Sequence, residues 1–128
     1  MRLLLDTHIV LAILRKDVAQ RFPVVTTLLG EPQTVGFVSV ASLWETAIKA
    51  RLGKLDPGMP LEEMAQSLQK IGLSLLGIDV SHVITAADPE PDTRDPFDRL
   101  LLAQCQIEGL RLVTIDRALA DHPLALKF

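Results

Sequence analysis

The chain has 128 residues, 48% of them hydrophobic, and its formal net charge is −3. A chain of this length and composition can bury a core as one unit, so we expect a single domain over residues 1–128. The acidic balance argues against a protein that coats nucleic acid electrostatically, although it does not exclude a nuclease. No apolar run approaches the length of a membrane span, and the amino terminus lacks a signal-peptide pattern, so we expect a cytoplasmic protein without a membrane partner.

The first half of the chain alternates short apolar runs with stretches of helical periodicity. Asp6 closes the first apolar run, and Pro23 suits the first turn of a helix that ends near Gly30. After the second run the apolar residues take helical spacing and stop before Gly53. These signals predict strands at 2–5 and 35–40 and helices at 9–13, 23–29 and 41–52.

The second half repeats this alternation. An amphipathic stretch ends at Gly72 and is followed by a third apolar run, after which Asp79 or Ser81 can cap a short helix. Pro96 opens a longer helix that Gly109 closes. The expected elements are helices at 61–71 and 96–108, strands at 73–78 and 111–115, and a loop at 88–94.

Strands that alternate with helices and are nearly continuous in apolar residues indicate an α/β fold with a parallel sheet covered on both faces. Ligands of such sheets collect at the carboxyl ends of the strands. Asp6 and Asp116 each follow an expected strand, so both are predicted to lie at one edge of the sheet.

Four acidic residues are candidates for a metal site. Carboxylates packed together without a cation would raise one another's pKa, whereas a divalent ion that prefers oxygen ligands keeps them charged. The cluster therefore predicts bound Mg²⁺ or Mn²⁺. The candidate residues are Asp6, Glu45, Asp98 and Asp116.

Local structural roles could account for two of these acids. Asp6 could cap the helix that follows it. Glu45 could complete a capping box with Ser42, although Ser39 is an equally good cap and would move Glu45 into the second helical turn.

The other two acids also have alternative readings. Asp95 suits a helix cap, but Asp98 shares its helical face with apolar side chains and needs a partner that Arg99 cannot easily supply. Asp116 could simply end a strand in a turn with a surface ion pair to Arg117.

Other catalytic motifs are absent. The three histidines have no zinc-ligand spacing, and neither a glycine-rich phosphate loop nor a serine-hydrolase elbow occurs. Cys105 is flanked by apolar residues, which favours a buried structural thiol. Thr114 lies two residues before Asp116, on the same side of the expected strand, where its hydroxyl could orient a carboxylate or a water, although the pattern favours a core or ladder position.

Four segments resemble the PIN domain family, specifically VapC-type toxins, and they occur in the family's order over nearly the whole chain. The resemblance implies a three-layer α/β/α sandwich with a central, mainly parallel sheet. It maps the family's metal-site acids onto the four candidates above and suggests Asp95 as an outer residue of the site. The segments are Leu4 to His8, Ser39 to Glu45 with Arg51 to Leu55, Asp95 to Gln104, and Leu112 to Asp116.

The resemblance also implies the toxin of a toxin–antitoxin pair. Such a protein would be a Mg²⁺- or Mn²⁺-dependent endoribonuclease that hydrolyses RNA phosphodiester bonds with a metal-activated water, using one ion or two. A small antitoxin would hold it inactive, often with the toxin as a homodimer. The alternatives are a PIN-type nuclease acting on DNA and a non-catalytic receiver-like module. A receiver needs a lysine near the last strand, and only Lys127 occurs late in the chain.

Overall fold

The computed structural model describes all 128 residues and contains one sheet of four parallel strands. The strand order is β3-β2-β1-β4, so β1 lies between β2 and β4. Leu5 of β1 pairs with Val38 on one side and with Val113 on the other. The strands are β1 (Arg2–Leu5), β2 (Val35–Ser39), β3 (Ser74–Leu76) and β4 (Arg111–Val113).

Helices connect the strands and cover the sheet. Between β1 and β2 lie α1 (Thr7–Leu14), α2 (Val18–Arg21) and α3 (Pro23–Leu29). Between β2 and β3 lie α4 (Val40–Arg51), the 3-10 helix η1 (Leu61–Glu63) and α5 (Met64–Lys70). The longer connection from β3 to β4 contains α6 (Val80–Ile84) and α7 (Pro96–Glu108), and α8 (Arg117–Ala120) follows β4.

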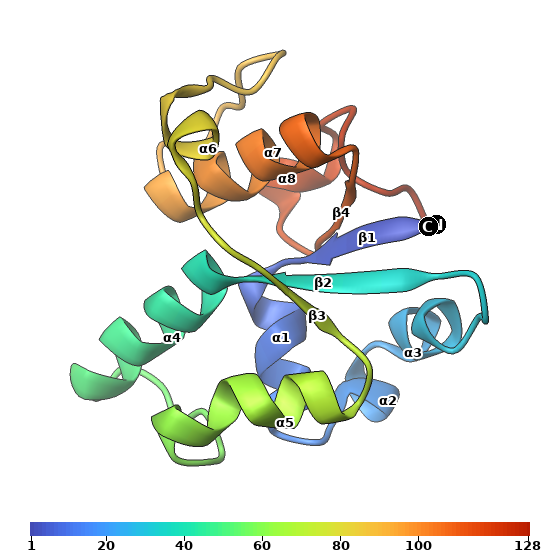
Figure 1. Cartoon of the computed structure of the whole chain (residues 1–128), viewed down its shortest axis with the longest axis vertical. Coiled ribbons are helices and arrows are strands. Elements are labelled where there is room, and N and C mark those ends of the chain that lie inside the picture. Colours follow the sequence, from blue (N-terminus) through green and yellow to red (C-terminus); the bar gives the residue numbers. More distant parts are fainter.

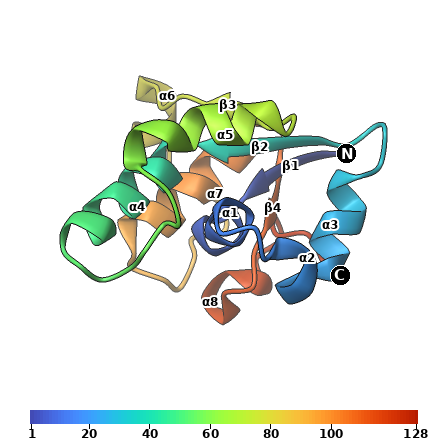
Figure 2. The same cartoon turned by 90° about the horizontal axis from the view of Figure 1, so that it is seen from below.

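Alternating side chains of the strands enter two separate hydrophobic cores, one on each face of the sheet. Leu3 and Leu5 belong to the core shared with α1, α3 and α5, whereas Leu4 and Leu112 belong to the core shared with α7 and α8. Figure 1 shows these two groups of helices on opposite sides of the sheet, and Figure 2 shows α1 and α5 from their own side. This arrangement confirms the predicted three-layer α/β/α sandwich with a parallel sheet.

The order of the strands reverses at the carboxyl ends of β1 and β4. From β1 the chain crosses to β2 on one side, and it later returns to β4 on the other side. In open parallel sheets ligands bind at such a reversal of strand order. All residues of the candidate site except Asp95 and Asp98 follow the carboxyl end of β1, β2 or β4 closely in the sequence.

The structure corrects three details of the sequence prediction. The strand predicted to reach Ile115 ends at Val113, because Asp6 N–H donates the last bond to Val113 O at 3.0 Å and β1 then turns into α1. Asp116 begins the helix α8, where the prediction had left only a turn, and Arg117 makes no ion pair. The helix α2 was also not predicted, because one helical turn is too short to show periodicity.

The remaining boundaries agree closely. Gly109 ends α7 in a left-handed conformation with φ 69°, as its position after the last apolar residue predicts. Asp79 caps α6. None of the helices combines the length and apolarity needed to cross a bilayer.

Candidate metal centre

Asp6 lies at the junction of β1 and α1 and uses its two carboxylate oxygens differently. Oδ1 caps α1 by accepting the backbone N–H groups of His8 at 2.9 Å and Ile9 at 3.3 Å. Oδ2 accepts the hydroxyl of Thr114. Burial raises the pKa of Asp6 above its usual value, more than these donors and the nearby His8 lower it. The capping role is therefore real, and it leaves a buried carboxylate whose ionised form a cation would favour.

Thr114 joins the two acids at the ends of β1 and β4. Its hydroxyl donates to Asp6 Oδ2 and accepts the backbone N–H of Asp116 at 3.0 Å. The Asp116 carboxylate in turn caps α8 by accepting the N–H of Ala118 at 2.9 Å. Thr114 is buried, so these two bonds set the relative position of the two acids.

Replacing Thr114 with valine keeps the shape of this side chain but removes both hydrogen bonds. A buried oxygen of Asp6 then loses its donor, and we expect the free energy of unfolding to fall by about 1–3 kcal/mol. Loss of a hydrogen bond to a carboxylate that would hold a divalent ion should also weaken Mn²⁺ binding about 10- to 100-fold. Urea unfolding and titration with Mn²⁺ would measure the two effects. Thr114→Ser is the matched control and should retain most of both properties; wild-type behaviour of Thr114→Val would contradict the bridging role.

Glu45 lies in the second turn of α4, because Ser39 caps that helix through a bond from Ala41 N–H at 3.0 Å. Of the two caps left open by the sequence, Ser39 is therefore the one used. Glu45 is buried, and its Oε1 accepts the hydroxyl of Thr7 at 2.7 Å. Its Oε2 pairs with Lys49 Nζ at 2.7 Å. The hydrogen bond to Glu45 raises the pKa of Lys49, so the ammonium stays charged beside the acids.

Asp98 lies in the first turn of α7, and its Oδ2 accepts the hydroxyl of Thr93 at 3.1 Å. The pKa of Asp98 is raised to about 6, chiefly by partial burial and next by the negative charge of Asp95. The charges of Asp116 and Glu45 add smaller contributions, and the hydrogen bond from Thr93 acts in the opposite direction. Arg99 is not its partner, because the guanidinium binds Glu90 at 2.9 Å and the backbone oxygens of Thr93 and Pro91.

The structure brings the four predicted acids into one electrostatic neighbourhood. Asp6 and Asp116 share Thr114, and the pKa of Asp98 responds to the charges of Asp116 and Glu45. Asp95 caps α7 through bonds from Phe97 and Asp98 N–H and lies next to this group. The four carboxylates do not converge on a single point, since no three of them bring ligand atoms within 4.8 Å of one another. Their donor set, entirely carboxylate oxygen, suits Mg²⁺ or Mn²⁺.

Three polar residues bind these carboxylates through a hydrogen bond or an ion pair. The sequence analysis did not assign them to the site. Thr7 follows Asp6 directly, and its hydroxyl donates to Glu45. Thr93 lies in a segment predicted only as a loop and donates to Asp98. Lys49 pairs with Glu45, and the spacing of four residues within a helix is the signal that could have identified the pair.

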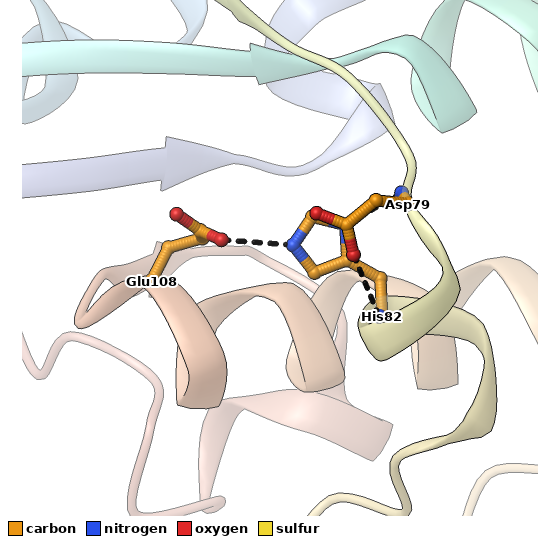
Figure 3. A group of neighbouring side chains, drawn as sticks. All are labelled: Asp79, His82 and Glu108. Atoms are coloured by element: carbon orange, nitrogen blue, oxygen red, sulfur yellow. Dashed lines mark hydrogen bonds and ion pairs between the residues drawn. The ribbon is translucent and has the colours of Figure 1, made fainter.

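A second group of metal-capable side chains lies at the other end of α7. Asp79, His82 and Glu108 bring one ligand atom each within 4.8 Å of the others (Figure 3). Both imidazole nitrogens are already used: Nδ1 accepts Asp79 N–H at 3.1 Å, and Nε2 faces Glu108 Oε2 at 3.0 Å. With Nδ1 as acceptor, the neutral ring carries its hydrogen on Nε2 and has no free lone pair for a metal. We therefore interpret this group as a structural link between α6 and α7.

Cys105 belongs to the core and not to a site. It is fully buried between the sheet and α7, and burial raises the pKa of its thiol to about 12. A thiol that stays protonated and inaccessible is a poor nucleophile.

The fold and its acidic edge define an α/β protein with a carboxylate site at the reversal of strand order. Comparison with known families identifies the family: the model of the PIN domain matches residues 3–123. The chain therefore belongs to the PIN domain family. Among solved structures, the chain is similar to VapBC2 from Rickettsia felis bound to a DNA fragment from their promoter. The match has a TM-score of 0.60 and 14% identity and covers 98% of this chain and 96% of that chain, which supports the shared fold. No curated protein matches the chain.

Proposed function

We propose that the chain, acting as one domain, is a divalent-metal-dependent endoribonuclease of the VapC type that functions as a toxin in the cytoplasm. The observation that supports this proposal is the proximity of four carboxylates from distant segments: Thr114 bridges Asp6 and Asp116, and the charges of Asp116 and Glu45 act on Asp98. Membership of the PIN domain family supports the same conclusion. Lys49 is the one lysine or arginine that pairs with any of the four acids, and it contacts Glu45. His8 Nδ1 lies 4.0 Å from Asp6 Oδ1 and adds positive charge there only when the ring is protonated.

The four acids would bind the metal ion in different ways. Asp6 and Asp98 would be the principal ligands of Mg²⁺ or Mn²⁺, and Glu45 and Asp116 would bind directly or through water. The ion would supply positive charge to the phosphate and make a nucleophile from water. Thr114, Thr7 and Thr93 each donate a hydroxyl to one of these carboxylates and so hold its orientation before substrate arrives.

Removal of the metal gives the direct test. With Mg²⁺ or Mn²⁺ present, the full chain should cleave single-stranded RNA or transfer RNA, and cleavage should stop in excess EDTA and return when Mg²⁺ is added back. DNA of the same sequence, incubated in parallel, tests the alternative substrate. Cleavage that persists in EDTA, or cleavage of DNA alone, would contradict the assignment.

We propose a small antitoxin as the partner, with the toxin itself as a homodimer. The similar solved structure contains VapBC2, which supports a partner of this kind. An acidic site would accept a basic side chain, since arginine binds carboxylates through two parallel hydrogen bonds. Purification of the chain from its native host should therefore yield a small companion protein whose addition inhibits cleavage; recovery of the chain alone, fully active, would contradict this.

The receiver-like alternative finds no support. A receiver would need a lysine near its last strand, and the one late lysine of this chain is engaged elsewhere. Lys127 Nζ donates to the backbone oxygens of Ala120 and His122.

A further inference from the structure

Two aromatic side chains each precede an acid of the candidate site in the sequence and contact one another. Trp44 precedes Glu45 on α4, and Phe97 precedes Asp98 on α7. Their ring centroids are 5.6 Å apart, with an interplanar angle of 73°. Successive residues of a helix point about 100° apart, so each ring leaves the same helical turn as its neighbouring acid in a different direction.

Trp44 is unusually exposed for a tryptophan, at 57% of its surface. Phe97 is partly buried against the core around α7 and anchors the pair. An edge-to-face pair covers one face of one ring only, so ring faces remain open to a planar ligand. Core packing explains Phe97, but it does not explain an indole that is left mostly in solvent.

The surface beside Trp44 combines apolar lining with positive charge, since Leu43, Ala47 and Arg51 line the same hollow as the indole. Arg51 and Lys54, at and just beyond the end of α4, are exposed and form no salt bridge. Lys49, five residues after Trp44 on the same helix, carries the charge that faces Glu45. Positive side chains that follow the backbone, together with aromatic faces that stack on bases, are the usual elements of single-strand binding.

We propose that Trp44, anchored by Phe97, stacks on an unpaired base next to the phosphate that is cut. The inference rests on the proposed nuclease function and narrows its substrate to a single-stranded segment, because a base within a duplex has no free face to offer. Trp44 is thus a positioning residue: it contacts the base, while the carboxylates act on the phosphate.

The chain offers its own probe, since it contains one tryptophan and no tyrosine. In an Asp98→Asn background with Mg²⁺, which keeps RNA intact, a single-stranded octamer of adenines should quench the emission of Trp44 as it binds. An octamer with the same backbone and abasic nucleotides should bind more weakly and leave the emission unchanged. Fluorescence anisotropy of labelled RNA would show binding independently of the tryptophan.

Matched substitutions separate stacking from simple apolar contact. Trp44→Leu should weaken octamer binding by about 5- to 150-fold, and Trp44→Phe should restore most of the affinity. In the chain with Asp98 intact, Trp44→Leu should raise KM more than it lowers kcat. Melting temperatures of both variants should match the wild type, because the indole is largely exposed.

The outcomes also distinguish this inference from the proposed function. If the wild-type chain cleaves RNA but its emission is unchanged at saturation, or Trp44→Leu binds as well as Trp44→Phe, the stacking role is wrong and the nuclease assignment stands. If only a protein partner changes the emission and depends on Trp44, the surface belongs to that partner and the inference is wrong. If the wild-type chain neither binds nor cleaves RNA, both fail.

Discussion

Replacing Asp98 with asparagine is expected to abolish metal-stimulated cleavage and, at the same time, to stabilise the metal-free protein at about pH 7.5. Asparagine can still accept the hydroxyl of Thr93, so the local hydrogen bond survives. It cannot supply the negative oxygen that a divalent ion requires. We expect activity to fall by more than about 100-fold, beyond the effect of losing an outer hydrogen bond.

The gain in stability follows from the raised pKa of Asp98. Its pKa is about 6 in the folded chain against an ordinary value of 3.8, so between these values the folded state binds more protons than the unfolded state. The free energy of unfolding therefore falls as pH rises through this range, and the full penalty is present above about pH 6. The shift corresponds to about 3 kcal/mol, which solvent screening of a half-exposed carboxyl reduces to about 1 kcal/mol.

Thermal melting with and without Mg²⁺ would test both the loss of metal binding and the gain in stability of the metal-free protein. In EDTA, Asp98→Asn should melt above the wild type at about pH 7.5 and level with it at about pH 3.5, where both side chains are neutral. Mg²⁺ should raise the melting temperature of the wild type but not of the variant. Glu31→Gln, an exposed acid in the turn before β2, is the matched control and should change neither result. If Mg²⁺ stabilises the Asp98→Asn chain as strongly as the wild type, Asp98 is not a ligand of the metal.

Replacing Gly36 with valine is expected to lower the free energy of unfolding by about 3 kcal/mol, a large part of the total of about 5–15 kcal/mol for a typical domain. A Cβ atom at Gly36 would lie 2.6 Å from Leu73 Cδ2 and 2.9 Å from Leu29 Cδ2. Gly36 pairs with Leu3 in the centre of the sheet, so β2 cannot move aside without disturbing β1.

Urea unfolding would measure this loss of stability, and a second substitution that makes room for the valine would show its cause. Because Leu73→Ala empties the space that the new side chain needs, the double variant should be less destabilised than the sum of the two single variants. Gly36→Ala should have a smaller effect than Gly36→Val. Strict additivity in the double variant would mean that the crowding lies elsewhere.

The elements best predicted from the sequence are those with strong signals at their ends. Pro96 and Gly109 delimit α7, and Pro23 opens α3, because proline fits only the first turn of a helix and glycine readily adopts the left-handed conformation after it. The single turns α2 and α8 have no such periodicity and were not predicted. The end of β4 was misplaced because strand length depends on the partner strand, which the local sequence does not contain.

In the candidate site, too, the local sequence predicted some features and left others to the tertiary structure. Asp6 offered two readings in the sequence, helix cap or ligand, and the structure shows that one oxygen caps α1 while the other faces Thr114. For Glu45 the sequence left two caps open, and only the position of Ser39 at the end of β2 decided between them. A carboxylate has two oxygens that can serve different partners, so a local pattern cannot assign both.

By itself, the sequence determined the α/β class, the order of the elements and the acids that were candidates for a metal site, because apolar periodicity, proline and glycine act within a few residues. Only the tertiary structure decided which side chains meet. Thr114 contacts Asp6 across 108 positions, and Thr7 contacts Glu45 across 38. These contacts exist because the strand order places β4 beside β1 and β2 on its other side. That order is chosen by the burial of both faces of the sheet together, and no single segment of the chain encodes it.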